Sequence, residues 1–355
     1  SMYTKRYVEQ YPQLLPPDIV SLLTQIHEYK GGQAQLIESD DEVLAILAEN
    51  AKIQSVKASC RMAGIATTDE RLKKIALDKT MPQTRSEQEI AGYRDVLTDI
   101  QENSGYLPPK PSVILQMHRN LYKFCGSALG GSYRASESPL PAKDTAGSTE
   151  PYGCQVPAGE VSRAMEQLCQ TYEAAATVSE VDPLLLRPMF VLDFLCIHPF
   201  SDGSGRMSRL LTLLLLQRAG YLVGKYSSIE WLIEQRRDDY SKALQQSAID
   251  WQAGQNDYRP FVCYTLGVVA AAYREFSGQV QALAARGKSK PERIREIIQT
   301  HPGAITKAEL MAQCPDISLA TVQRTLAELQ KNDKIIKLGG GRYTAYMWNQ
   351  ERKPC

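Results

Sequence analysis

The sequence has few histidines, no paired cysteines and almost no excess of charge. Only four of its 355 residues are histidine, and its eight cysteines are scattered without a Cys-x-x-Cys pair. This pattern argues against a zinc cluster and is typical of small core residues in a reducing compartment. The formal net charge of +1 argues against a global attraction to nucleic acid or membranes, so any such binding needs a local patch.

Long uninterrupted apolar runs are also missing. Arg187, Pro188 and Asp193 break the most apolar segment, and the next one ends at Gln217-Arg218. Neither run can span a bilayer, which requires about 20 apolar residues. No signal-peptide pattern opens the chain, so we expect a cytoplasmic protein with no membrane partner. The length allows two or three domains.

Apolar residues recur at helical spacing through most of the first 285 residues, and little of this region alternates with period two. Such spacing predicts amphipathic helices. The predicted helices cover residues 42–51, 86–103, 111–124, 159–178, 231–250 and 261–283. We therefore expect a mainly all-α fold, a helical bundle, for this part of the chain.

Residues 198–209 hold the densest group of reactive and phosphate-binding residue types. They read His-Pro-Phe-Ser-Asp-Gly-Ser-Gly-Arg-Met-Ser-Arg, and apolar helical runs flank them. We therefore expect a loop that leads into a second helix near Gly205. A helix N-terminus attracts anions, glycines let successive N–H groups converge, and arginines pair with phosphate oxygens. The pattern indicates a site for a phosphorylated ligand beside a titratable group, His198.

Each of these residues also has an ordinary structural interpretation. A histidine that closes an apolar helix is more often structural when it stands alone, and an Asp followed by Gly is commonly a turn. Arg209 also suits a plain surface position, but its spacing of three residues from Arg206 favours a shared ligand.

The segment resembles the signature of the Fic family, His-Pro-Phe-x-Asp/Glu-Gly-Asn-Gly-Arg-x-x-Arg. Eight of the nine specified positions match, and the exception is Ser204, where the family has Asn. The resemblance implies that His198 is the general base and that Asp202 holds a Mg²⁺ bridging nucleotide phosphates. Phe200 would anchor the loop in the core. The implied nucleotide contacts are Gly203, Ser204, Gly205, Arg206 and Arg209.

The activity implied by the resemblance is that of a protein adenylyltransferase. Such an enzyme transfers AMP from ATP to a Tyr, Thr or Ser hydroxyl of a target protein or of itself. Some relatives transfer UMP, phosphate or phosphocholine, and the form Gly203-x-Gly205-Arg206 favours nucleotidyl transfer. Because serine lacks the amide of asparagine, we expect Ser204 to alter nucleotide affinity while the backbone anion site persists. ATP and Mg²⁺ are thus the expected ligands, and the target protein stays open.

Residues 130–157 differ from the helical segments because they are rich in Gly and Pro and poor in aliphatic side chains. This composition predicts a loop or a short hairpin. Its opening, Gly131-x-Tyr133-Arg134, resembles the lead-in to the flap of the family. That flap, expected at 131–157, is a hairpin that holds a target segment by backbone pairing. A plain solvated connector is the alternative.

A segment around residues 55–66 resembles the inhibitory helix of the family, Ser/Thr-x-x-x-Glu-Gly/Asn. Ser59 and Gly64 match its ends, but Ala63 occupies the Glu position. In relatives this Glu pairs with the second arginine of the signature, here Arg209, and blocks the γ-phosphate. The resemblance therefore implies that Arg209 is unopposed, either because the natural protein lacks this brake or because position 63 carries a substitution. An accidental match within an ordinary helix is the alternative.

The pattern changes after residue 285. Short helices are predicted at 291–300, 306–313 and 318–332, followed by strands at 334–338 and 342–348. This order resembles a winged helix-turn-helix domain. The predicted organisation is an N-terminal segment at 1–34, a Fic domain at 35–285, a linker at 286–290 and a winged domain at 291–355.

The winged domain leaves its partner open. Residues 291–346 contain eight Lys/Arg and six Asp/Glu, an excess too small to decide between DNA and protein contacts. The residues that would face DNA are Ser318, Thr321, Gln323, Arg324, Lys334, Lys337 and Arg342. The alternative function is therefore a transcriptional regulator or adaptor whose nucleotide site only senses its ligand. Removal of AMP, which some relatives perform with the inhibitory Glu, is disfavoured by Ala63. Whether the chain forms a homo-oligomer stays open.

Overall fold

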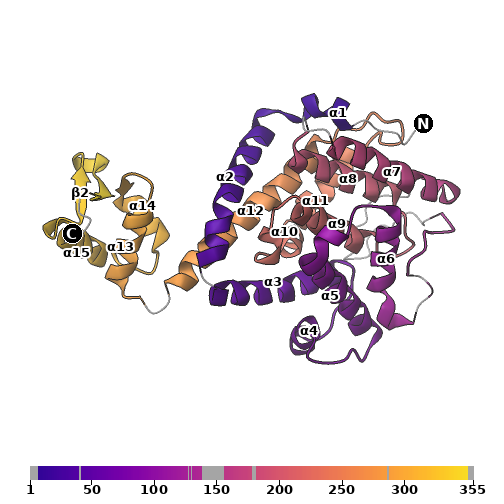
Figure 1. The fold of residues 1–355 in the computed structure, drawn as a ribbon, viewed down its shortest axis with the longest axis horizontal. Helices are drawn as coiled ribbons and strands as arrows, with labels where there is room; N and C mark the ends of the chain where they lie inside the picture. Colours follow the sequence, from indigo (N-terminus) through magenta and orange to yellow (C-terminus); the bar gives the residue numbers. More distant parts are fainter. Residues whose placement is uncertain are drawn as a thin grey trace. The chain divides into compact units, whose positions relative to one another are not determined.

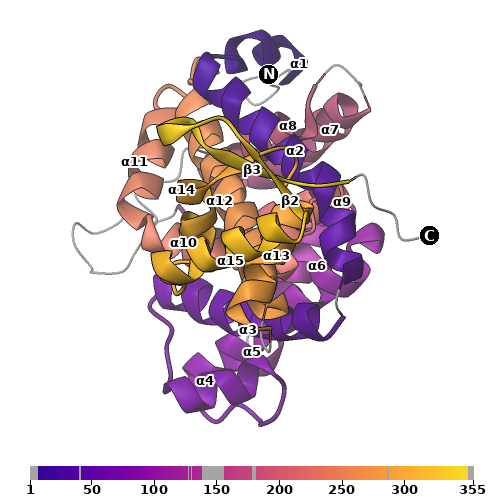
Figure 2. The ribbon, with the colours of Figure 1, turned by 90° about the vertical axis from the view of Figure 1, so that its left-hand side faces the viewer.

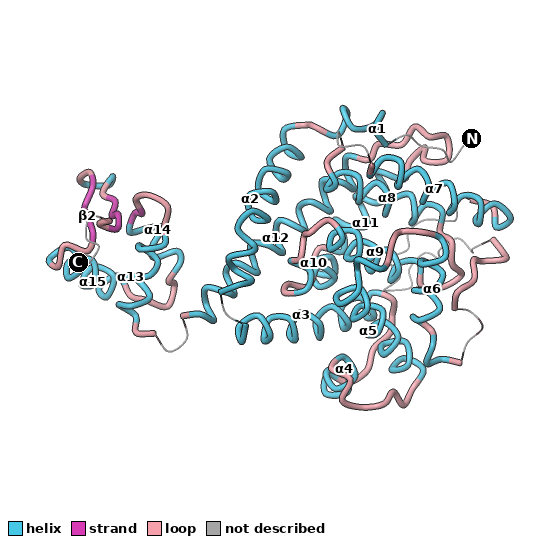
Figure 3. Tube along the Cα trace, viewed as in Figure 1, coloured by secondary structure: helices cyan, strands magenta, loops and turns pink. Residues whose placement is uncertain are grey.

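The computed structural model describes residues 7–39, 41–126, 128, 130–137, 156–177, 181–285 and 288–350 (Figure 1). Helices dominate these residues, and the few strands within them lie in the C-terminal part (Figure 3). The chain divides into two compact units, Ser1–Val280 and Gln281–Cys355, which are treated separately below. No helix in the described ranges has both the length and the apolar character needed to cross a membrane.

The first unit is a bundle of α-helices joined by loops and single 3₁₀ turns. Its helices are α1 (Tyr7–Gln10), α2 (Pro17–Ser39), α3 (Asp41–Met62), α4 (Asp69–Ala76), α5 (Arg85–Asn103), α6 (Pro111–Leu121), α7 (Val161–Ala176), α8 (Pro183–Ile197), α9 (Ser204–Arg218), α10 (Ile229–Gln235), α11 (Arg237–Ala248) and α12 (Arg259–Ala284). The 3₁₀ turns are Tyr11–Leu14, Ser104–Tyr106, Lys123–Cys125, Ala158–Glu160 and Val223–Lys225. The last helix, α12, continues past the end of the first unit.

The mainly helical fold predicted from the sequence is confirmed, although the bounds of the predicted helices differ from those observed, most of all at two of them. The helix expected at 231–250 is in fact two helices, α10 and α11, separated at Arg236, whose backbone is not helical (φ −113°, ψ 34°). The helix expected at 42–51 continues to Met62 as α3. Its second half buries small and polar residues such as Ser59, so the apolar pattern ends before the helix does.

Helices α8 and α9 form the centre of the first unit. A helix that is apolar on every side must be buried on every side, and nearly all residues of α8 are buried against α7, α9 and α11. Most of α9 is buried too, including the polar Ser204, Arg206, Ser208 and Arg209. The signature loop that joins these two helices is therefore held at both ends by the core.

One buried carboxylate ties distant parts of the first unit to α8. Asp193 accepts hydrogen bonds from the Tyr7 hydroxyl at 2.6 Å, from Trp251 Nε1 at 2.7 Å and from the Tyr258 hydroxyl at 2.8 Å. These donors come from α1 and from the segment between α11 and α12. Because an unpaired buried carboxylate costs several kcal/mol (roughly), the donors both stabilise Asp193 and fix their own segments on α8.

The second unit contains three helices and a small antiparallel sheet, both visible in Figure 2. Its elements are α13 (Lys290–Thr300), β1 (Ile305–Thr306), α14 (Lys307–Gln313), α15 (Leu319–Lys331), β2 (Ile335–Leu338) and β3 (Ala345–Trp348), with one 3₁₀ turn at Gly341–Tyr343. The strands are ordered β1-β3-β2. Its core comprises Ile294, Ile298, Ile305, Leu310, Cys314, Ile317, Val322, Leu326, Leu329, Ile335 and Tyr346.

The elements of the second unit follow the predicted order of three helices and a two-stranded wing, with β1 added. Complete capping boxes begin α13, through Ser289 and Glu292, and α14, through Thr306 and Glu309. These caps explain why two short helices start where they do. Residues 286–287 of the predicted linker lie outside the described residues, and the winged-domain assignment stays a prediction.

The contact between α5 and α6 depends on a glycine. A Cβ on Gly92 would lie 2.0 Å from the carbonyl oxygen of Leu121, which is backbone and cannot move aside. We expect Gly92→Ala to destabilise the protein by about 1–3 kcal/mol, the usual cost of overpacking. Gly278→Ala is the matched control because a Cβ there meets nothing within 4 Å. It should be neutral or stabilising by up to about 1 kcal/mol. Urea unfolding checks both, and equal midpoints for the two variants would contradict the assignment.

Candidate functional site

The loop at residues 198–203 joins α8 to α9 with two unusual backbone conformations. His198 ends α8 at a φ of 49°, a left-handed conformation that costs on the order of 1–2 kcal/mol outside glycine. Pro199 follows it and disfavours continuation of the helix. Gly203 precedes α9 at a φ of 88°, and a Cβ there would come within 2.9 Å of the Tyr122 hydroxyl. The loop is thus strained at its histidine and closely packed at its glycine.

Arg134 fixes the backbone around the histidine. Its buried guanidinium donates to the carbonyl oxygens of His198 at 2.6 Å and Ile197 at 3.1 Å. Its backbone N–H donates to the carbonyl of Pro199 at 2.9 Å. The same guanidinium donates to the carbonyl of Val156, near the end of the predicted flap. One arginine therefore joins the start and the end of the flap segment to the His198 backbone.

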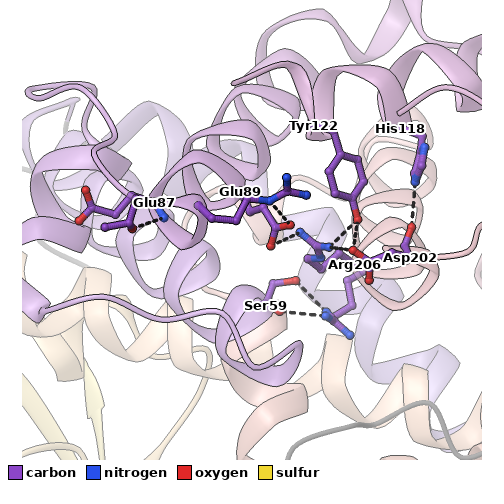
Figure 4. Close-up of polar contacts among 10 residues, drawn as sticks. Ser59, Glu87, Glu89, His118, Tyr122, Asp202 and Arg206 are labelled. Carbon is purple, nitrogen blue, oxygen red and sulfur yellow. Dashed lines mark hydrogen bonds and ion pairs between the residues drawn. The ribbon is translucent and has the colours of Figure 1, made fainter. Parts of the chain in front are cut away.

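His118 of α6 connects the flap to the signature loop. Its Nδ1 accepts the backbone N–H of Gly131 at 3.0 Å, so the ring proton is on Nε2, which donates to the carbonyl of Asp202 at 2.9 Å (Figure 4). The ring stacks on Phe200, with centroids 3.7 Å apart and an interplanar angle of 3°. Burial lowers the pKa of His118 to about 4, which keeps the imidazole neutral at pH 7.

The carboxylate of Asp202 meets a tyrosine and an arginine (Figure 4). The Tyr122 hydroxyl donates to Asp202 Oδ2 at 2.5 Å and accepts from Arg206 Nη2 at 2.8 Å. Burial raises the pKa of Tyr122, so the tyrosine keeps its proton as a donor. The Asp202 side chain is nevertheless 58% exposed, so a ligand in solvent can reach it.

Arg206 is a buried arginine, and the described residues use only some of its N–H donors. It is 1% exposed, and its Nε and Nη1 have no hydrogen-bond partner among the described residues. Glu89 Oε2 lies 3.9 Å from Nη1, too far for a hydrogen bond. Leaving a buried donor unpaired costs about 1–3 kcal/mol, more for a charged group. A phosphate oxygen is the kind of acceptor that would satisfy these donors.

The start of α9 combines this arginine with a helix N-terminus. The first helical bond of α9 runs from the Met207 N–H to the Gly203 carbonyl at 2.9 Å, so the N–H groups of residues 204–206 precede the ladder. The Ser204 hydroxyl is fully buried and bonds back to the N–H and carbonyl of Phe200, both at 3.3 Å. Ser204, at the position where the family has Asn, therefore links the start of α9 to Phe200 within the same loop. Phe200 is also fully buried, as an anchor would be.

Arg209 has no carboxylate partner among the ion pairs of the described residues, but it is hydrogen-bonded to α3. Arg209 Nε donates to Ser59 Oγ at 2.8 Å, and its Nη2 donates to the Ser59 carbonyl at 2.9 Å. A serine of α3 thus reaches the arginine without help from position 63. Both acceptors are uncharged, so Arg209 is held in place but not neutralised by them.

Ala63 and Gly64 form the turn that ends α3. The N–H groups of Ala63 and Ile65 donate to the carbonyl of Cys60, each at 3.0 Å, and Gly64 has a φ of 75°. This is the left-handed ending that glycine favours after a helix. Ala63 is exposed in this turn, one helical turn beyond Ser59.

The predicted flap is described only at its ends. Residues 138–155 lie outside the described part of the chain, so its hairpin stays a prediction. Gly131 and Arg134 make the contacts given above. Tyr133 packs near Phe200 with ring centroids 5.8 Å apart, and burial raises the pKa of its hydroxyl.

Comparison with known proteins places this site in a family. Residues 108–216 match the family model described as Fic/DOC family. The chain contains a Fic domain at these residues. It is 30% identical over 181 residues to the protein adenylyltransferase Fic of Aedes aegypti, and 40% identical over 98 residues to that of Culex quinquefasciatus. These matches cover 48% and 25% of this chain but 31% and 17% of the relatives, so the chain matches less than a third of either mosquito protein.

Solved structures share the fold. A Fic family protein from Desulfovibrio desulfuricans superposes with a TM-score of 0.60 at 21% identity, covering 96% of this chain and 98% of that one. A Fic-domain signalling protein from Bacteroides thetaiotaomicron gives a TM-score of 0.61 at 17% identity, covering 75% of this chain and 100% of the other. At these identities the likeness concerns the fold alone.

Sequence reasoning did not identify two residues of the Fic domain that touch the signature loop, His118 and Tyr122. They lie four residues apart in the segment of α6 and the turn that follows it, so they face the same side. A histidine and a tyrosine in register within an otherwise apolar face were the available signal. Burial alone does not separate such residues from ordinary core positions.

Proposed function

We propose that this Fic-domain protein is a protein adenylyltransferase. It would transfer AMP from ATP to a Tyr, Thr or Ser hydroxyl of a target protein or of itself. The relatives named adenylyltransferase support the reaction class. The observation that carries the proposal is Arg206, whose buried, unpaired donors adjoin a helix N-terminus and the exposed carboxylate of Asp202. This combination suits the phosphates of a nucleotide.

In the proposed reaction, His198 is the general base. The target hydroxyl oxygen forms a bond to the α-phosphorus while the bond from that phosphorus to the bridging oxygen breaks, and pyrophosphate leaves. His198 takes the hydroxyl proton and returns it to solvent. Its backbone is held by Arg134, which supports a fixed approach to the nucleotide. Positioning of this kind, with charge stabilisation, supplies most of the rate in phosphoryl-type transfers.

The phosphate contacts in the proposal divide between two turns of α9. The backbone of Gly203 to Gly205 and the Arg206 side chain would bind the phosphates nearest the reacting centre. Arg209 would bind the terminal phosphate, and to do so it would exchange the Ser59 acceptors for phosphate oxygens. Because Ser59 is neutral, this exchange favours the more strongly charged partner.

The residues present fit a magnesium ion that arrives with the nucleotide. No group of three or more His, Cys, Asp or Glu gathers as a metal site in the described ranges. Magnesium at nucleotide sites is commonly held by one or two carboxylates together with the phosphates, and the exposed Asp202 offers one. Bound there, the ion would neutralise phosphate charge.

The first test removes the proposed base. His198→Ala should lower AMP incorporation from α-phosphate-labelled ATP by at least about 100-fold, because general-base catalysis contributes about 10²–10⁴. Calorimetry should show that Mg²⁺–ATP binding is retained. His301→Ala, in the second unit, is the matched control and should label like the parent. Equal labelling by His198→Ala and the parent would contradict the proposal, and mass spectrometry of a labelled lysate would identify the target.

The second test restores the inhibitory carboxylate. Ala63→Glu should lower auto-modification by about tenfold. A carboxylate beside Arg209 would compete with the terminal phosphate for the guanidinium, and a charge-assisted hydrogen bond of this kind contributes about 1–2 kcal/mol. Ala63→Gln has the same length without the charge and should stay near the parent. Labelling with ATP at fixed protein concentration measures both. If Ala63→Glu and Ala63→Gln are labelled equally, a carboxylate at position 63 does not interact with Arg209, which contradicts the prediction.

We also propose, as a second function, that the C-terminal unit binds DNA. The structure ties several acidic groups of this unit, because Glu292 and Glu309 serve in capping boxes and Asp316 pairs with Arg293 at 2.6 Å. In contrast, basic side chains on α15 and the wing are exposed, namely Arg324, Lys334, Lys337 and Arg342. These four basic side chains outnumber the exposed acids of the same elements, Glu328 and Asp333, which leaves a local positive excess.

The DNA proposal is tested by removing two of these charges. Arg324→Ala with Lys337→Ala should weaken DNA retention at low salt by about tenfold or more and flatten its salt dependence. Lys73→Ala with Lys79→Ala removes the same charge from exposed positions of the first unit and serves as the control. Equal retention by the two double variants would instead favour a protein partner for the C-terminal unit.

A further inference from the structure

His118 connects two segments that the proposed reaction must bring together. One is the root of the flap at Gly131, from which a target segment would be presented. The other is the backbone of Asp202, in the loop that also carries His198. The ring bonds to the first through Nδ1 at 3.0 Å and to the second through Nε2 at 2.9 Å. Both ring nitrogens are therefore used, one as acceptor and one as donor.

We propose that His118 is a positioning residue that sets the flap root against the signature loop, and so sets how a target hydroxyl meets the nucleotide. This inference rests on the adenylyltransferase function proposed above. His118 itself acts through Gly131 and Asp202 and is not a member of the reacting set. In this proposal His118 orients the two segments and takes no part in proton transfer.

The His118 ring is held in a single orientation. His118 is 2% exposed, and its stack on Phe200, 3.7 Å between centroids and 3° between planes, fixes the ring plane. A flip of the ring by 180° would exchange Nδ1 with Cδ2 and Nε2 with Cε1, so that carbon atoms would face Gly131 and Asp202 and both hydrogen bonds would be lost. The hydrogen bonds at both nitrogens thus select one orientation and one tautomer.

The flap root is shaped to meet this ring. Gly131 has a φ of 83°, which an ordinary side chain rarely adopts, and a Cβ there would lie 2.9 Å from Arg119 Nε. Glycine at this position lets the backbone N–H reach His118 across the turn. The residue type and the hydrogen bond therefore support each other.

Arg134 supplies the second point of attachment. Three residues after Gly131, it bonds to the carbonyls of His198 and Ile197 and to the carbonyl of Pro199. One attachment would leave the flap root free to pivot, whereas two attachments define its direction. His118 and Arg134 together hold the root on opposite ends of the same loop, at Asp202 and at His198.

Two substitutions separate the two bonds of His118. In His118→Asn the side-chain oxygen can replace Nδ1 as the acceptor for Gly131, but the amide is too short to replace Nε2. In His118→Gln the amide nitrogen can replace Nε2 as the donor to Asp202, but nothing replaces Nδ1. The variants have similar chemistry and opposite losses, so each is the control for the other. His118→Phe keeps a ring to stack on Phe200 and loses both bonds.

The measurements are amide hydrogen exchange at Gly131, calorimetric binding of Mg²⁺–ATP, and auto-modification with labelled ATP. We expect His118→Gln to speed exchange at Gly131 and to lower auto-modification by about tenfold or more, while the nucleotide dissociation constant stays within about twofold of the parent. We expect His118→Asn to keep Gly131 protected and to weaken nucleotide binding by about threefold or more, through the loosened Asp202 loop. His118→Phe should show both losses.

Two results would overturn the inference. One is unchanged Gly131 exchange in His118→Gln. The other is the same profile in all variants, in proportion to the loss of their unfolding midpoints, which is what a merely structural histidine predicts. A parent that binds nucleotide but transfers no AMP would instead reject the proposed reaction, and the exchange measurement would still report on the coupling of flap and loop.

Discussion

The structure depends on the burial of α8 and α9 along most of their length. Because the end of α8 and the start of α9 are packed in the core, the six-residue connection between them has fixed ends. That constraint allows His198 to remain in a left-handed conformation that a free loop would relax. It also places the N-terminus of α9, with its partial positive charge, at a constant distance from the histidine. The core thereby prepares a site before any ligand is bound.

The arginines of α9 show how the site treats charge. Arg206 lies among Tyr122, Asp202 and the more distant Glu89, yet keeps donors unpaired, whereas Arg209 is held by neutral acceptors of Ser59. Neither arginine is bound to a close, bidentate carboxylate in the described residues. A guanidinium in this condition loses little when a phosphate replaces its partners. Because position 63 is Ala and not Glu, Arg209 has no charged partner there. The contact of Arg209 with α3 is made by Ser59 instead.

The helical fold and the position of the signature loop could be predicted from the sequence. Some helix bounds and several contacts of the loop could not, for physical reasons. Apolar spacing identified the helices because burial of one face imposes it, but it ended α3 early, where Ser59 and other small residues form the buried face. The loop residues were identified because their types are rare in combination. Tyr122 and His118 were missed because a buried aromatic in a helix is usually core, and only distance reveals that each touches Asp202. The bond from Arg209 to Ser59 was missed because pattern comparison reports which residue is absent, not which neighbour takes its place.

Asp193 gives the first unit a further property. Its hydroxyl and indole donors belong to α1 and to the chain just before α12, so opening either segment would remove part of the hydrogen bonding of a carboxylate inside α8, five residues before His198. The ends of a domain usually unfold locally at little cost. Here the free energy of detaching the N-terminal helix includes the loss of the Tyr7 hydrogen bond to a buried charge. Detaching the first helix would therefore weaken a contact with α8, the helix that leads into the signature loop.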